Sequence, residues 1–169
     1  MEVLERTEQT LEWLKQNNSD VLTLALDQLT LGRAYFQQTL SQCHGGADDD
    51  CQALQQAACW LDQAVTGLQE AGQQQYLPLG LLTRTALHRH IGDHTRAHQD
   101  LQEVFDIAEP SGMRLQLTDY HLEMARLLLA ENDSDGARQH TEEAGRLIEE
   151  TGYHRRDAEL AELQRSLSA

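Results

Sequence analysis

Five kinds of position recur at an interval of forty residues, and this interval constrains the fold more than any other feature of the sequence. The recurring positions hold small or aliphatic residues, followed by a glycine. The five columns are Ala57, Ala97 and Ala137; Leu61, Leu101 and Thr141; Ala64, Val104 and Ala144; Leu68, Ala108 and Ile148; and Gly72, Gly112 and Gly152. The first four columns are spaced four, three and four residues apart, so they share one face of an α-helix. The glycine can take the left-handed conformation that ends such a helix, so each copy predicts a helix that stops at its glycine.

A second amphipathic segment precedes each of these helices and carries a small residue where two helices must approach closely. The small positions are Gly32, Thr85 and Ala125. In the second and third copies the pairs Gly92-Asp93 and Asn132-Asp133 follow this segment. Gly or Asn can end one helix in the left-handed conformation, and Asp is a favoured N-cap of the next. Each copy therefore predicts a helix hairpin.

The first copy has a longer connection than the other two. Gly32 and Ala57 are separated by 25 residues, and the extra segment runs from Cys43 to Cys51 through three consecutive aspartates. We interpret it as two lengthened helices joined by a flexible acidic loop. Asp49, with Gln52 three residues later, resembles a capping box and is expected to start the second helix.

The pattern as a whole predicts an all-α fold of about eight antiparallel helices, arranged as three hairpins with terminal half-repeats. The expected helices lie near residues 2–17, 20–42, 50–71, 76–91, 94–109, 113–131, 134–151 and 155–167. Pro78 suits the first turn of its helix, and Pro110 suits a position just after a helix end. We expect residues 1–169 to form a single repeat domain that is a fragment of a larger protein.

Composition and charge exclude several classes of partner. The chain has 28 acidic against 13 basic residues, a formal charge of -15, which disfavours binding to nucleic acid and to anionic membrane surfaces. No stretch approaches 18 consecutive apolar residues, and the N-terminus lacks the apolar segment of a signal peptide. Three cysteines are an odd number in a chain too large to need disulfides, which favours a reducing compartment, and the absence of a C-x-x-C pair disfavours a redox or metal role. These features indicate a cytoplasmic protein.

The hairpin pattern resembles the tetratricopeptide repeat (TPR) family. Leu31, Gly32 and Tyr35 match its Leu-Gly-x-x-Tyr element, and Ala57, Leu61 and Ala64 match its Ala-x-x-x-Leu-x-x-Ala element. The resemblance covers about residues 20–151, although the interval of forty exceeds the usual 34 and the consensus tryptophan is missing from all three copies. The longer interval is similar to TPR arrays of large bacterial signalling ATPases and regulators. The resemblance implies an α-solenoid whose first helices line a concave face that binds a protein or peptide.

Carried onto this sequence, the resemblance implies a binding groove on the first helix of each pair. The expected partner-binding residues are Arg33, Phe36, Arg89, His90 and Arg126. The arginines would hold carboxylates of an acidic peptide, and Phe36 would be an apolar anchor. Alternatively, each arginine bridges to acidic residues of its own chain, and Phe36, Leu82 and Leu122 pack between stacked helices in the core, which is the role favoured for the two leucines.

The only other concentration of reactive side chains is a run of histidines, His88, His90, His94 and His98, within eleven residues. His94 and His98 have the i, i+4 spacing that can hold a divalent metal, but no Glu or Cys completes a recognised motif. A structural or surface role is favoured, and we expect no metal site and no cofactor.

No phosphate-binding loop or nucleophile elbow occurs, so we expect a binding protein and not an enzyme. The function that competes with groove binding is a sensory or oligomerisation segment. Such a segment would form a homodimer through its terminal helices.

Overall fold

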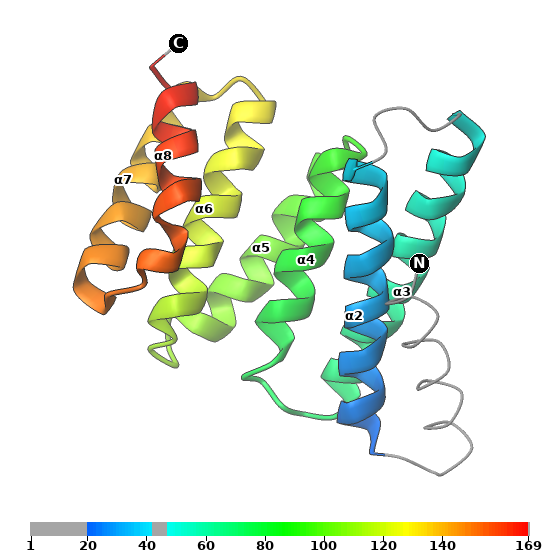
Figure 1. Cartoon of the computed structure of the whole chain (residues 1–169). Coiled ribbons are helices and arrows are strands. Elements are labelled where there is room, and N and C mark those ends of the chain that lie inside the picture. The colour runs from blue at the N-terminus through cyan, green and yellow to red at the C-terminus, as the bar shows by residue number, and fades with distance from the viewer. Residues whose placement is uncertain (1–19, 42–46, 169) are drawn as a thin grey trace. The chain divides into compact units, whose positions relative to one another are not determined.

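The computed structural model describes residues 20–41 and 47–168, and these residues are helical with no strands (Figure 1). They form seven α-helices and one 3-10 turn: α2 (Val21–Ser41), α3 (Ala47–Glu70), α4 (Leu77–His90), α5 (His94–Ala108), α6 (Arg114–Ala130), α7 (Ser134–Thr151), η1 (His154–Arg156) and α8 (Asp157–Ser166). The expected all-α class is therefore confirmed. The chain divides into two compact units, Met1–Leu87 and His88–Ala169.

In the first unit, α2 and α3 form an antiparallel pair that packs closely at two glycines (Figure 1). A Cβ atom on Gly32 would lie 2.6 Å from Leu61 Cδ2 and 3.2 Å from the Leu61 backbone nitrogen. A Cβ atom on Gly67 of the opposite helix would lie 2.9 Å from the Cβ atom of Ala25. The small residue predicted at position 32 is therefore required by direct contact between the helices.

The second unit contains α5, α6, α7, η1 and α8, in which each helix packs on the next in sequence and α8 also packs on α6. Leu122 and Ala125 of α6, Ala144 of α7 and Leu163 of α8 form one buried cluster. A second cluster joins Ala108, Leu117 and Leu147 at the other end of the same helices. The predicted hairpin of α6 and α7 is present in this unit.

The recurring columns are the buried faces of α3, α5 and α7. The alanine column is fully buried in all three helices, and the next column is buried too, at 0% exposure for Leu61 and Leu101 and 3% for Thr141. Thr141 remains compatible with the core because its hydroxyl donates to the Ala137 carbonyl at 2.7 Å. The glycine column has positive φ angles of 65°, 64° and 70° in the three copies. The interval of forty therefore marks a structural repeat.

The two predicted turns have the expected geometry. Gly92 and Asn132 adopt positive φ angles of 77° and 65°. The carboxylate of Asp93 accepts from the backbone N–H of Arg96 at 3.1 Å, and Asp133 accepts from the backbone N–H of Gly136 at 3.0 Å. Both aspartates are therefore N-caps, which satisfy amide groups that have no partner within the helix.

The start of α3 differs from the expectation. The helix begins at Ala47, so Asp49 lies inside it and is not its N-cap, and the three consecutive aspartates belong to the helix and not to a loop. Acidic residues are favoured throughout the first turn of a helix, so a run of three does not identify the residue that starts it. The expected helix near 2–17 and the connection at 42–46, with Cys43, lie outside the described residues. Pro78 is the second residue of α4 and Pro110 lies two residues after α5, as predicted.

Candidate binding surface

In the first unit, Arg33 projects from α2 toward α4 and remains exposed. Its Nε donates to Thr83 Oγ1 at 3.0 Å, and its Nη2 donates to the Leu79 carbonyl at 3.3 Å. The Thr83 hydroxyl in turn donates to the same carbonyl at 2.8 Å. These bonds bring the first helices of two successive repeats side by side, with a guanidinium group at the surface between them.

Phe36 lies in the interior of the same unit. Its exposure is 9%, and it packs with Leu29, Leu61 and Leu87. Because the ring is already covered by its own chain, it is not an exposed apolar anchor. Leu82 and Leu122, at 9% and 1% exposure, are also buried, which confirms the core role favoured for both leucines.

In the second unit, Arg89 and Arg126 belong to a chain of alternating charges, here called the charge ladder. It joins the end of α4 to α6, η1 and α8, and its members are Arg89, Glu123, Arg126, Glu159, Arg156 and Asp119. Arg89 Nε lies 3.4 Å from Glu123 Oε2, and Arg126 pairs with Glu123 and, at 2.5 Å, with Glu159. The alternative interpretation of these two arginines, bridging to acids of their own chain, is therefore correct.

At the other end of the charge ladder, Arg156 and Asp119 form a bidentate ion pair. Arg156 Nε and Nη2 donate to the two carboxylate oxygens of Asp119 at 2.7 and 3.1 Å. The remaining Nη1 of Arg156 donates to Glu159, so Glu159 connects this pair to Arg126. A bidentate arginine to carboxylate contact fixes both the direction and the distance of the two groups. Arg156 thus ties the start of α8 to α6.

The charge ladder is largely shielded from water, because its six side chains are only 12% to 30% exposed. Burial raises the pKa of Asp119, against the hydrogen bond and the charge of Arg156. Burial also acts to raise the pKa of Glu159, but hydrogen bonds and charges from Arg126 and Arg156 outweigh it and lower that pKa. With three carboxylates facing three guanidinium groups, this surface of the second unit is close to neutral. It is not the basic stripe that the arginines alone suggested.

The sequence reasoning did not single out Glu123 or Glu159, because the bridging it offered for the arginines named no particular acids. The spacing of Asp119, Glu123 and Arg126 at i, i+4 and i+7 places all three on one face of α6, and this spacing is the signal that could have identified them.

The histidines of the 88–98 segment point to different partners. His88 is 7% exposed, with its Nε2 3.8 Å from Asp100 Oδ2, and His90 is exposed at the end of α4. His94 Nδ1 and His98 Nε2 lie 3.4 and 3.0 Å from the carboxylate of Glu131. Among the described residues, no group of three or more His, Cys, Asp or Glu side chains is arranged to hold a metal ion.

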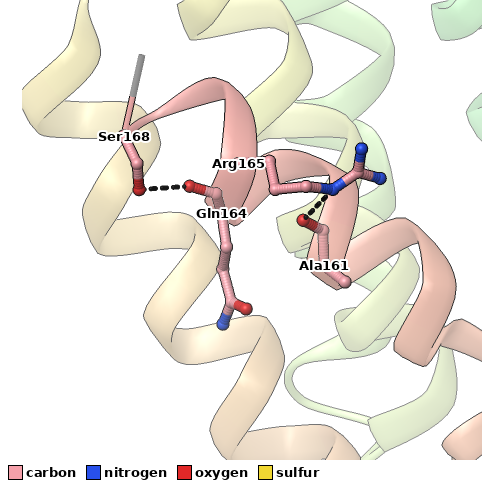
Figure 2. Close-up of a pocket in the computed structure, with 4 residues that line it drawn as sticks. All are labelled: Ala161, Gln164, Arg165 and Ser168. Atoms are coloured by element: carbon pink, nitrogen blue, oxygen red, sulfur yellow. Dashed lines mark hydrogen bonds between the residues drawn. The ribbon is translucent and has the colours of Figure 1, made fainter.

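An open depression of about 460 Å³ lies on α8, lined by Ala161, Gln164, Arg165 and Ser168. Figure 2 shows that the polar groups here bond within the helix, since Ser168 Oγ donates to the Gln164 carbonyl and Arg165 Nε to the Ala161 carbonyl. All four residues come from α8 and the two residues that follow it. The depression is therefore a shallow helix surface without converging side chains from a second element.

The chain matches no protein-family model, and no curated protein sequence matches it. In the part of the chain that the structure describes, no helix has both the length and the apolar character needed to cross a membrane.

Proposed function

We propose that this chain is a TPR-like helical-repeat scaffold that binds a protein or peptide segment and carries out no chemistry of its own. The observation that carries the proposal is the lateral contact between successive first helices, α2 with α4 in the first unit and α6 with α8 in the second. In a TPR-like solenoid these helices form the concave face, where an extended partner can touch several repeats at once.

The first unit offers the better docking point. Arg33 is exposed, and a guanidinium group at a helix surface can hold a carboxylate of the partner in a bidentate contact. Exposed Gln37 lies one turn further along the same face of α2, where it can bond to the partner's backbone. In the second unit, a partner's carboxylate has to compete with Glu123 and Glu159 for Arg126. Because Arg33 is exposed and Arg126 is only 22% exposed, we assign recognition of an acidic segment to Arg33 and a supporting role to Arg89, His90 and Arg126.

The test compares three forms of the full chain as bait in extracts of the native organism. Arg33→Glu reverses the exposed charge, while the matched control Arg138→Glu reverses an arginine of α7 that is 52% exposed and pairs with Asp135 of its own helix. We expect the wild type and Arg138→Glu to retain the same protein and Arg33→Glu to lose it, with unchanged circular dichroism for all three. Equal retention by Arg33→Glu, or equal loss by both variants, would contradict the proposal.

Self-association through the terminal helices is the competing function. The observation in its favour is the outer surface of α8, where the small side chains Ala158 and Ala161 are exposed beside the open depression. A helix of a second copy could pack closely on such small residues. Light scattering over a range of concentrations distinguishes the two functions, because a constant monomer mass excludes the self-associating form.

A further inference from the structure

Two histidines from different helices of the second unit face each other directly. His121 of α6 and His140 of α7 have their Nδ1 atoms 2.8 Å apart and their ring centroids 5.0 Å apart. Both rings are partly buried. At this distance one Nδ1 donates and the other accepts, so Nδ1 carries a proton in one neutral ring and none in the other.

The surroundings of the pair are mostly aromatic. The ring of Tyr120 meets His121 edge-on at a centroid distance of 4.9 Å and His140 at 6.0 Å. Phe105 of α5 also contacts Tyr120, with ring centroids 5.3 Å apart. These rings limit the access of water, so a positive charge on either imidazole is poorly solvated.

Charged groups face the pair from each neighbouring helix. From α7, Glu143 favours protonation of both histidines, and Arg146 opposes protonation of His121. The same Glu143 is hydrogen bonded to Arg146 and also faces Arg114 of α6, which reduces its effect on the rings. From α5, the charge of Asp106 adds to burial in raising the pKa of Tyr120. The nearest carboxylate is thus shared with arginines.

Burial, with a further contribution from the charge of His140, lowers the pKa of His121 to about 4, against the effect of Glu143. Burial also lowers the pKa of His140 from its usual 6.5. Both rings are therefore neutral at pH 7. A single added proton leaves the contact intact, because a protonated ring can donate through Nδ1–H to its neutral partner. A second proton places N–H groups on both facing atoms, and the rings then repel each other.

We propose that the His121–His140 contact is an acid-sensitive link that holds α6 and α7 together while at least one ring is neutral and is lost when both rings are protonated. This link joins the two helices of one repeat and lies apart from the charge ladder. Acidification would therefore loosen the third hairpin. The inference does not depend on the identity of the binding partner.

The sign of the effect on stability follows from proton linkage. Histidines in an unfolded chain titrate near pH 6.5, whereas His121 in the folded protein has a pKa of about 4. Between these values the unfolded state binds more protons, so the stability contributed by the pair is complete above pH 6.5 and is lost as the pH falls toward 4. One proton bound only by the unfolded state raises the unfolding equilibrium constant by up to about tenfold per pH unit.

The first test is a nitrogen-detected NMR titration of the histidine rings in the full chain. We expect His121 to take up its proton well below pH 6.5, the ordinary value for histidine, and we expect the α6 and α7 amides to lose hydrogen-exchange protection at acidic pH before those of α3. A titration of His121 near 6.5, or uniform loss of protection in all helices, would overturn the proposal.

The second test replaces both histidines with polar residues that do not titrate. In His121→Asn with His140→Asn, the side chains can still hydrogen bond to each other but take up no proton, so the pH dependence of unfolding between 6.5 and 4 should flatten. The control His154→Gln changes an exposed histidine that lies 3.3 Å from Asp157 and should keep the wild-type slope. An equal pH dependence of unfolding in all three proteins would contradict the proposal. Stabilisation of the wild type by added Zn²⁺ at pH 7 would also contradict it, because it would identify the pair as a metal site.

Discussion

Arg33 and Arg126 occupy the same position of the repeat, immediately after the small residue of the first helix, yet the structure uses them differently. Arg33 in the first unit is exposed and donates to the Thr83 hydroxyl and the Leu79 carbonyl. Arg126 in the second unit is 22% exposed and contacts the carboxylates of Glu123 and Glu159. The repeat thus sets where an arginine stands, while residues outside the repeating columns decide which groups it contacts.

The same contrast extends to how the helices of each hairpin meet. In the first unit, Gly32 allows α2 to touch Leu61 of α3 directly, and the nearest side-chain atoms there are aliphatic carbons of Leu61. In the second unit, α6 meets α7 partly through the polar contact of His121 with His140. Apolar packing resists changes of pH and salt, whereas the polar contacts respond to both. We therefore expect substitutions in the two hairpins to differ in size and in their dependence on conditions.

The largest effect is expected at the close contact of the first hairpin. Gly32→Leu should lower the free energy of unfolding by about 3 kcal/mol, because even a Cβ atom would lie 2.6 Å from Leu61 Cδ2. Gly145→Ala is the matched control, since a Cβ atom there meets Leu160 at an ordinary 3.5 Å. This control should stabilise the protein by about 0.5–1 kcal/mol through helix propensity. Chemical denaturation gives the free energy of unfolding of both variants. Similar effects at the two glycines would mean that the close contact at Gly32 does not make this position more sensitive to substitution than Gly145.

The next effect concerns the charge ladder. Arg126→Ala should cost about 2 kcal/mol, because it leaves Glu123 and Glu159 facing each other in a partly buried site. A double-mutant cycle of Arg126→Ala with Glu159→Gln should give a coupling energy of about 1 kcal/mol that decreases in high salt. A coupling near zero would mean that the ladder is ordinary surface charge. In that case the second unit would resemble the first.

Much of the repeat could be read from the sequence. The four buried columns follow helical periodicity, and the turns at Asn132 and Gly92 follow from the few residues that tolerate a left-handed backbone. Such features are local, because each depends on residues within one or two turns of helix. The structure starts α3 three residues before the expected position, since capping residues and first-turn acids have overlapping compositions.

The surface chemistry was harder to predict because it depends on pairs distant in the sequence. Arg126 and Glu159 are 33 residues apart, and no periodic pattern connects them. His121 and His140 face each other across a hairpin, and their helical positions alone do not determine that both rings turn inward. Phe36 was expected at the surface because the resemblance assigns groove positions by register. In this chain its ring turns into the core with Leu29 and Leu61.

A pH experiment sharpens the contrast between the units. The pKa of Glu159 is lowered in the folded protein, so its contribution to stability is complete above the unfolded value of about 4.5 and is lost as the pH falls through the folded value. Glu159→Gln should therefore cost about 1 kcal/mol at pH 7 and less at pH 3. Thermal unfolding of both proteins at the two pH values provides the measurement. A constant difference would show that Glu159 acts through packing and not through charge.

The smallest effect is expected at the equivalent position of the first unit. Thr83→Val keeps the shape of the side chain and removes the oxygen that accepts from Arg33 Nε at 3.0 Å. A double-mutant cycle with Arg33→Ala should give a coupling of only about 0.3 kcal/mol, because an exposed hydrogen bond competes with water. This coupling should not change with salt, since threonine carries no charge. A coupling as large and as salt-dependent as that of Arg126 with Glu159 would mean that both arginines are held equally.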